Sequence, residues 1–358
     1  MSTLPIAMAL SGGGVRAIAF HLGVLRYMAA NHMLERVTQV SSVSGGSLAI
    51  GLVMHAAGMQ WPSSVAFLGQ AYPDVRKQLC TSSLQNAALR QLLNPANLRF
   101  CLSRTNLLAF ALRDEWGIRS RLADLPETPE WSINATTAET GKRFRFKSRD
   151  FGDYTLGYAS SLNFPLAHAL AVSAALPGGL GPLTFDTRKY AWRKREWDAP
   201  VGSDSAVSAG FDRLHLYDGG VYDNLGLEPF FDAGRGQIKQ PGHYIVASDA
   251  GKPLPVGFDM RSLNPFRFKR VADIMSDQSR ALRVRTFHSY IQGGPDRGAF
   301  LYIGTPTSTE QPCTAAQFAV AFPTTLRRLS SEEFDRLADH GYAVAEGWEN
   351  VHGFNGRG

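Results

Sequence analysis

Cysteine is scarce in this chain. Its 358 residues contain only Cys80, Cys101 and Cys313, which lie far apart and show no Cys-x-x-Cys spacing. An odd, scattered set argues against a disulfide framework and against a zinc site. We therefore expect three buried or incidental thiols in a core large enough to fold without disulfides or a metal.

Long hydrophobic runs are also missing. No stretch of about 18 apolar residues is free of charge, as a helix that crosses a bilayer would require. Residues 1–10 have no basic start, and their apolar run is too short for a secretory signal. We expect a cytoplasmic or peripheral membrane protein with neither a cleaved signal nor a transmembrane helix.

The apolar segments that are present alternate between strand and helix patterns. A short apolar run at 6–10 and a β-branched run at 37–43 each end in a glycine-containing turn, and a helical pattern follows each turn. This rhythm is typical of a parallel sheet in an α/β fold, with both turns at the carboxyl edge of the strands. Further patterns predict strands at 131–136, 144–146, 214–217 and 243–248, and helices at 167–176, 272–287 and 331–345. We expect one domain over 1–358, with an irregular helical insertion at 61–128 as a candidate cap.

A candidate nucleophile stands in the turn after the second strand. The sequence VSSVSGG at 40–46 places Ser44 between a strand and a helix, which is the context of a nucleophile elbow. Such a turn needs small residues two positions before and after the serine, and Ser42 and Gly46 occupy these positions. The alternative is that Ser44 or Ser47 only caps the helix.

A run of glycines follows the first strand. Gly12, Gly13 and Gly14 could direct several backbone N–H groups into one space, as an oxyanion hole requires. A phosphate-binding P-loop would need a Lys-Ser/Thr pair after the glycines, and a dinucleotide site would need them spaced rather than contiguous. Arg16 follows the loop; it could hold the loop in place, contact a lipid phosphate, or lie on the surface.

A candidate base ends the predicted strand at 214–217. Asp218 is followed by Gly219 and Gly220, so its carboxylate is free of bulky neighbours and could accept the proton of a serine hydroxyl. Asp-Gly-Gly also suits a plain β-turn. Asp223 is the alternative base, although its sequence context is more typical of the next turn or of a helix cap.

In this order, the three segments resemble the signatures of the patatin-like phospholipase family: a GGGxR loop, a GxSxG elbow and a DG[GA] motif. The resemblance runs from about Ile6 to Ala250 and includes the small-residue helix before Pro177. It implies a three-layer fold around a mostly parallel sheet. It also implies a Ser44–Asp218 dyad, an oxyanion hole at the 12–14 amides, and cleavage of acyl esters of phospholipids or related lipids. Ser42 and Ala17 stand where the family has glycine.

A histidine is not needed for such a dyad. In a Ser–His–Asp triad the histidine would follow the acid, yet no downstream histidine sits in a glycine-flanked loop after a strand. The downstream histidines are His243, His288, His340 and His352, and His215 lies near Asp218 only in sequence. We expect all nine histidines to be structural or exposed.

The net charge of +6 predicts an anionic partner surface. Basic residues cluster at 142–147, 188–195 and 267–270 with aromatic residues between them, a mixture that suits either lipid headgroups or single-stranded nucleic acid. Beside an esterase core we favour the membrane, and we expect no nucleic acid and no metal or organic cofactor. The remaining alternatives are an acyltransferase with the same dyad and a non-catalytic binding protein.

Overall fold

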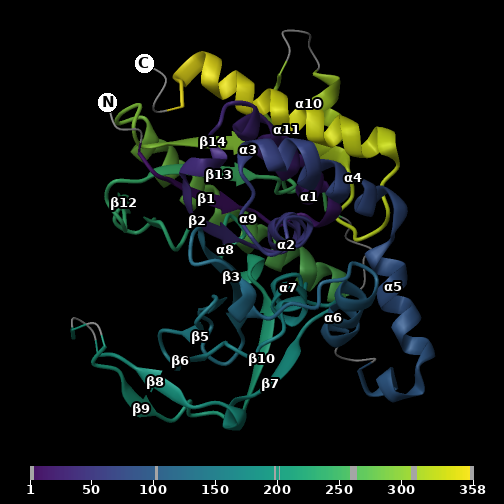
Figure 1. The fold of residues 1–358 in the computed structure, drawn as a ribbon, viewed down its shortest axis with the longest axis vertical. Helices are drawn as coiled ribbons and strands as arrows, with labels where there is room; N and C mark the ends of the chain where they lie inside the picture. The colour runs from purple at the N-terminus through teal and green to yellow at the C-terminus, as the bar shows by residue number, and fades with distance from the viewer. Residues whose placement is uncertain are drawn as a thin grey trace.

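A large mixed sheet organises the chain (Figure 1). The computed structural model describes residues 4–100, 104–196, 199–200, 202–258, 264–307 and 313–354. The strands are β1 (Ile6–Leu10), β2 (Val37–Ser42), β3 (Glu130–Thr137), β4 (Arg143–Phe146), β5 (Asp150–Asp153), β6 (Gly157–Ser160), β7 (Leu183–Asp186), β8 (Trp192–Lys194), β9 (Ser205–Val207), β10 (Arg213–Asp218), β11 (Phe231–Asp232), β12 (Gln237–Ile238), β13 (Tyr244–Asp249) and β14 (Gly298–Tyr302).

The strands are connected by helices that differ widely in length. They are α1 (Gly14–Ala30), α2 (Gly45–Ala56), α3 (Ser64–Ala66), α4 (Tyr72–Thr81), α5 (Leu84–Arg90), α6 (Thr105–Asp114), α7 (Leu166–Ser173), α8 (Gly220–Asp223), α9 (Asn264–Ile291), α10 (Thr314–Ala321) and α11 (Ser331–His352). Every strand and helix predicted from the sequence is present, with shifted ends. The largest shift is in α9, which begins at Asn264 because Pro265 is tolerated in a first helical turn.

The core of the sheet is parallel, in the order β14-β13-β1-β2-β3. Helices cover both of its faces, so the fold has three layers. Along β1, Ile6, Met8 and Leu10 belong to one apolar cluster, which includes α1, α2 and α11. Ala7 and Ala9 face the opposite side and pack in a second cluster with the end of α9. This alternation is the period of two that a strand imposes.

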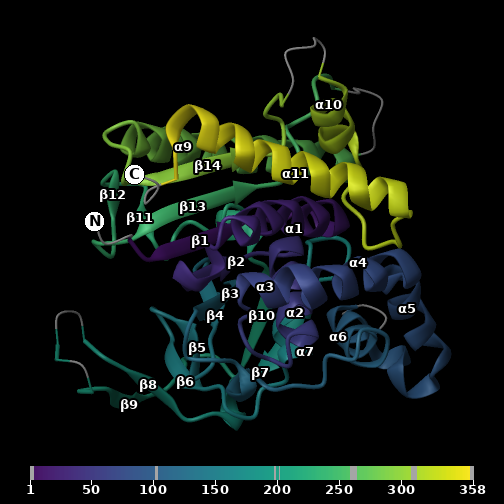
Figure 2. The same cartoon turned by 45° about the horizontal axis from the view of Figure 1, so that its top comes forward.

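Helices α1 and α11 lie along one another on the first face (Figure 2). Their backbones approach closely at two glycines. A Cβ added to Gly23 would lie 1.8 Å from the Ala338 carbonyl oxygen, and one added to Gly341 would lie 2.1 Å from that of Phe20. Only glycine allows this separation, so the two helices depend on both positions.

Beyond β3 the sheet becomes antiparallel, through β4, β5, β6, β8 and β9. The sheet as a whole is therefore mixed, and its core strands are parallel as predicted. Most strands of this antiparallel extension were not predicted from the sequence. They have only three or four residues, which is too few to show a clear alternation of apolar and polar residues. Aromatic side chains form the core of this extension, including Phe144, Phe146, Phe151, Phe185 and Trp192.

Residues 61–128 contain α3 to α6 and short 3-10 and π-helical turns. The segment joins β2 and α2 to β3, two strands that lie side by side in the sheet. Leu107 and Leu108 of α6 and Leu84 of α5 are buried. The insertion thus has apolar residues of its own that pack over the carboxyl edge of the parallel strands (Figure 2).

Candidate active site

Ser44 occupies a strained turn between β2 and α2. Its φ of 50° and ψ of −118° lie in a region that a residue with a side chain rarely adopts. A Cβ on Gly46 would lie 2.6 Å from the Leu10 carbonyl oxygen, so only glycine fits two residues after the serine. The geometry is that of a nucleophile elbow, in which a sharp turn raises the serine hydroxyl above the sheet.

The register of β3 explains how Ser44 and Asp218 meet. β4 occupies one edge of β3, so β2 and β10 must share the other. β2 runs parallel to β3 and ends with Ser42 opposite Ile133, whereas β10 runs antiparallel and ends with Asp218 opposite Ala135. Two residues along a strand span about 7 Å. The two strands therefore point at one another, and the turns that follow them converge.

Asp218 is buried at this junction. Its Oδ1 accepts a hydrogen bond of 2.7 Å from the Gly220 N–H. Burial raises the pKa of the Asp218 carboxyl to about 7, whereas the Gly220 N–H and the Ser44 hydroxyl act in the opposite direction. Gly219 is required for packing, because a Cβ there would lie 2.6 Å from the Asn134 carbonyl oxygen.

The alternative base, Asp223, uses its carboxylate to accept backbone hydrogen bonds in the turn that follows it. Its Oδ1 accepts the Leu225 N–H at 3.1 Å and its Oδ2 accepts the Glu228 N–H at 2.8 Å. It does not line the cavity that holds Ser44. Its geometry is that of a turn or helix cap.

The histidines have other partners. His21, fully buried, donates from Nε2 to the Ser11 carbonyl and accepts at Nδ1 from the Ser248 hydroxyl; burial lowers its pKa to about 4. His215 contacts Glu139, and His340 donates to the Ile303 carbonyl. Within the described part of the chain, no histidine lines the cavity that contains Ser44 and Asp218.

The glycine loop lies against the elbow, but its three amides differ. Gly12 departs from the expectation, because its N–H already donates to the Asn224 carbonyl at 3.2 Å. Gly13 and Gly14 have φ values of 151° and 63°, and Gly14 lines the same cavity as Ser44. Gly45, not noted in the sequence, is the first residue of α2, so its N–H has no acceptor within the helix. The candidate oxyanion donors are therefore Gly13, Gly14 and Gly45.

Arg16 is a structural residue. It is 1% exposed, and its guanidinium donates to the Phe322 carbonyl at 2.6 Å and to the Ala250 carbonyl at 3.0 Å. Burial lowers its pKa to about 10. Of the three roles considered from the sequence, contact with a lipid phosphate and a place on the surface are wrong. Arg16 holds the start of α1 against the turn after β13.

A chain of hydroxyl groups runs beneath Ser44. The Trp131 Nε1–H donates to Ser42 Oγ at 2.8 Å, and the Ser173 hydroxyl at the other end donates to the Asn134 carbonyl at 2.7 Å. Between them, Ser42 and Ser47 are 2.9 Å apart and Ser47 and Ser173 are 2.8 Å apart. Because the indole only donates and the carbonyl only accepts, every hydroxyl proton points toward Asn134. Ser42 thus has a partner on each side, which accounts for a serine where the motif has glycine.

The end of α7 touches both candidate catalytic residues. The Ser44 N–H points at Ser173, 3.0 Å from its Oγ and 3.1 Å from its carbonyl oxygen, and the Asp218 N–H donates to the Ala175 carbonyl at 3.0 Å. One short segment therefore fixes the positions of both backbones. This role of Ser173 was not predicted, because the contact joins residues 129 positions apart.

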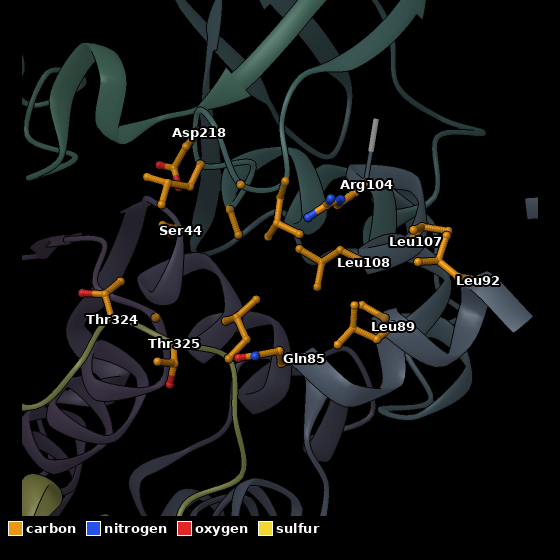
Figure 3. Close-up of a pocket in the computed structure, with 17 residues that line it drawn as sticks. Ser44, Gln85, Leu89, Leu92, Arg104, Leu107, Leu108, Asp218, Thr324 and Thr325 are labelled. Carbon is orange, nitrogen blue, oxygen red and sulfur yellow. The ribbon is translucent and has the colours of Figure 1, made fainter. Parts of the chain in front are cut away.

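A cavity of about 350 Å³ opens from Ser44 and Asp218 (Figure 3). It leads away from them toward Leu89, Leu92 and Leu107 of the insertion. Its lining is mainly aliphatic, with a few polar residues: Gly14, Ser44, Gln85, Ala88, Leu89, Leu92, Arg104, Leu107, Leu108, Ala174, Leu176, Gly179, Leu180, Asp218, Thr324, Thr325 and Leu326. The size is typical of a small-molecule site.

Two of the three basic clusters differ from the expectation. Phe144 and Phe146 at 142–147, and Trp192 at 188–195, are buried, so their aromatic rings belong to the core of the sheet extension. In the third cluster Phe268 is 75% exposed. Among the aromatic side chains of these three clusters that the structure describes, Phe268 is the only exposed one.

Neither a metal site nor a membrane span was found in the regions that the structure describes. No group of three or more His, Cys, Asp or Glu residues there could hold a metal ion. No helix there is long and apolar enough to cross a bilayer. Cys80 is half-buried and Cys313 is buried, whereas Cys101 lies outside the described residues.

Comparison of whole folds gives similar structures of low sequence identity. Human GIVD cytosolic phospholipase A2 matches with a TM-score of 0.54 and 14% identity over 98% of this chain. Its complex with methyl gamma-linolenyl fluorophosphonate matches with a TM-score of 0.52 and 14% identity over 98% of this chain and 58% of that one. VipD from Legionella pneumophila gives a TM-score of 0.40 at 13% identity, with 98% of this chain and 67% of VipD covered. The chain spans 62% of the length of the human enzyme, and the likeness establishes the fold.

Sequence comparison identifies the family. No curated protein sequence matches the chain significantly. A sequence model of the family described as Patatin-like phospholipase matches residues 8–231, which is more than half of the chain and includes the glycine loop, the elbow and the Asp-Gly-Gly turn. The chain therefore belongs to the patatin-like phospholipase family, whose members are generally serine lipid hydrolases.

Proposed function

We propose that this protein hydrolyses fatty-acyl esters of phospholipids or lysophospholipids, with Ser44 as nucleophile and Asp218 as its only side-chain base. The observation that carries the proposal is that a serine in a strained turn and a buried carboxylate both line the head of an aliphatic cavity. Membership of the family supports the same class of reaction.

The reaction begins with proton transfer from the Ser44 hydroxyl to the Asp218 carboxylate. Ser44 Oγ attacks the ester carbonyl carbon, and the oxygen that becomes negative is held by the N–H groups of Gly13, Gly14 and Gly45. The bond from carbon to the alcohol oxygen then breaks, and protonated Asp218 returns its proton to the departing alcohol. Ser44 is left as an acyl ester.

Water opens the acyl ester in the second half of the reaction. Asp218, again ionised, accepts a proton from a water molecule as its oxygen attacks the acyl carbon. The tetrahedral intermediate collapses, Ser44 recovers its proton from Asp218, and the fatty acid departs. The raised pKa of Asp218 suits this role, because a base of pKa about 7 can both take and release a proton near neutral pH.

The aliphatic cavity supports a fatty-acyl substrate. Ser44 and Asp218 lie on one side of the cavity, and Leu89, Leu92 and Leu107 lie on the other (Figure 3). A carbonyl placed at Ser44 would therefore leave its acyl chain among these leucines. Burial of each methylene there contributes about 0.8 kcal/mol. The cavity therefore favours an alkyl chain over a polar acyl group.

The test combines covalent labelling with product analysis. A fluorophosphonate probe should label the parent and not Ser44→Ala, and mixed phospholipid vesicles should yield free fatty acid only with the parent. Asp218→Asn should lose at least about a thousandfold in turnover, and the Ser44→Ala/Asp218→Asn double variant should be little worse, because the two residues act as one unit.

Three outcomes would contradict parts of this proposal. Equal labelling of Ser44→Ala would exclude Ser44 as the nucleophile. A larger loss from Asp223→Asn than from Asp218→Asn would exclude Asp218 as the base. Transfer of the acyl group to a lysolipid or alcohol in place of release as fatty acid would make the protein an acyltransferase.

A further inference from the structure

The first half of α9 is largely exposed in the described structure. None of residues 267–282 is buried, whereas Phe287 and Ile291 near the end of the helix pack in the second apolar cluster. Large apolar side chains nevertheless lie on this exposed stretch: Phe268 (75%), Val271 (54%), Ile274 (40%), Met275 (68%) and Leu282 (59%).

All but Ile274 share one face of the helix. Phe268, Val271, Met275 and Leu282 follow one another at steps of three, four and seven residues, which is the spacing of a single helical stripe. An exposed apolar patch of this kind is typical of an interaction surface rather than of scattered surface residues.

Positive charge surrounds the stripe. Residues 252–290 contain eight lysines and arginines against three aspartates, a surplus of five in a chain whose net charge is +6. Lys269 and Arg270 lie beside Phe268, and exposed Arg285 follows Leu282. Lys269 is exposed and pairs with Asp273 one turn along the same helix. Arg280 and Arg283 pair with Asp249 and Glu228, so they fix the helix to the body. An apolar face bordered by cations complements an anionic lipid surface.

The stripe is on the same side of the molecule as Ser44. Arg280 of α9 contacts Asp249, the last residue of β13, and β13 is parallel to β1 and β2. The carboxyl ends of these strands share one edge, and Ser44 lies just past the end of β2. Phe268 precedes Arg280 by 12 residues, which corresponds to about 18 Å along the helix axis. The stripe therefore extends outward from the edge that carries the candidate active site.

We propose that the α9 stripe (Phe268, Val271, Met275 and Leu282, with Lys269, Arg270 and Arg285) docks on an anionic lipid surface. The inference rests on the proposed lipid hydrolase function. It assigns the membrane contact to the third basic cluster, at 267–270, in place of the two clusters whose aromatic rings are buried. The apolar face enters the headgroup region while the cations meet lipid phosphates. A substrate molecule then has a short path from the bilayer to Ser44.

Binding is measured by co-sedimentation in a Ser44→Ala background, so that no lipid is consumed and no catalytic step enters the result. The vesicles are phosphatidylcholine alone or with phosphatidylglycerol. Val271→Glu/Met275→Glu should weaken binding to the anionic vesicles at least about tenfold, because each lost side chain forfeits its transfer into the interface. The matched control Val65→Glu/Val351→Glu changes two residues that are 72% and 74% exposed elsewhere and adds the same charge.

A second pair of variants separates charge at the stripe from charge in general. Arg270→Gln/Arg285→Gln should weaken binding to anionic vesicles and reduce its dependence on salt, whereas Arg193→Gln/Lys194→Gln, in the second basic cluster, should do neither. Melting temperatures of all variants establish that each is folded.

Several results would overturn the proposal. These are unchanged binding by Val271→Glu/Met275→Glu, equal losses in both glutamate pairs, and equal binding to neutral and anionic vesicles. Tighter, salt-sensitive binding to a single-stranded oligonucleotide would assign the stripe to nucleic acid. A parent dimer that Val271→Glu/Met275→Glu dissociates would assign it to a second copy of the chain. Failure of the hydrolase proposal would appear separately, as absent labelling of Ser44 in the parent.

Discussion

At the scale of single residues, Asp218 combines burial with a charge that catalysis requires. Its carboxyl is 4% exposed, and burial raises its pKa to about 7. In the proposed mechanism only the ionised form accepts the Ser44 proton. We therefore expect kcat/KM for a soluble ester to fall as pH is lowered through about 7 and to level off above it. Because no histidine lines the cavity, the same profile should persist in His215→Gln and His340→Gln. A profile that shifts or vanishes in either variant would implicate that histidine.

The same burial predicts a cost in stability. The folded chain holds the Asp218 proton up to about pH 7, whereas an unfolded chain releases it near pH 4. Unfolding therefore releases a proton between these values, and the contribution of Asp218 to stability declines as pH rises through that window.

Asp218→Asn removes the charge and keeps an oxygen that can accept the Gly220 N–H. We expect its melting temperature to exceed that of the parent at about pH 8 and the difference to shrink at about pH 5. Thermal melts across this range provide the measurement. A variant less stable than the parent at about pH 8 would mean that the ionised carboxylate stabilises the fold.

Residue identities at the site were largely predictable, and their contacts were not. The strand-turn-helix pattern around Ser44 and the glycines after Asp218 are local features, and the sequence displays them. The engagement of the Gly12 amide by Asn224 and the support from Ser173 depend on contacts between distant segments. The buried rings at 142–147 were predictable in principle, since the alternation of Arg and Phe in a strand places the two types on opposite faces.

At the scale of elements, the contact between α1 and α11 depends on two glycines. A Cβ at Gly23 would meet the Ala338 carbonyl oxygen at 1.8 Å, so Gly23→Ala must push the helices apart. We expect a loss of about 1–3 kcal/mol in the free energy of unfolding, as for other overpacked cores. Gly347→Ala is the control, because no atom lies within 4 Å of its added Cβ. It should be neutral or stabilise by up to about 1 kcal/mol through helix propensity. Denaturant titrations of both variants would show the difference, and equal effects would contradict the close packing.

The lengths and pairings of the strands also determine which of them could be predicted from sequence patterns. Four of the five parallel strands were predicted, and the clearest is β1, which is buried on both faces and forms a continuous apolar run. The edge strand β14 was not predicted. β8 and β9 have three residues each and could not be recognised. β10 was predicted as a strand, but its antiparallel pairing with β3 was not, and this pairing is what brings Asp218 to Ser44.

At the scale of the whole molecule, the two ends of the cavity come from different parts of the chain. The sheet and its turns supply Ser44 and Asp218, and the insertion at 61–128 supplies the leucines at the far end (Figure 3). The division suggests that chemistry and acyl-chain selection can change independently, because they reside on different segments.

Leu92 offers a direct test of this division. It lies at the end of the cavity remote from Ser44 (Figure 3) and is half-buried, so Leu92→Trp would fill the end of the cavity with little disturbance of the core. We expect its activity on long-chain p-nitrophenyl esters to fall about tenfold relative to short-chain esters, since each methylene that no longer fits loses about 0.8 kcal/mol of burial. Labelling of Ser44 by a small fluorophosphonate should keep its rate. Leu93→Trp is the matched control, because the Leu93 side chain is 82% exposed and does not line the cavity. Unchanged chain-length preference in Leu92→Trp, or an equal shift in Leu93→Trp, would show that the acyl chain lies elsewhere.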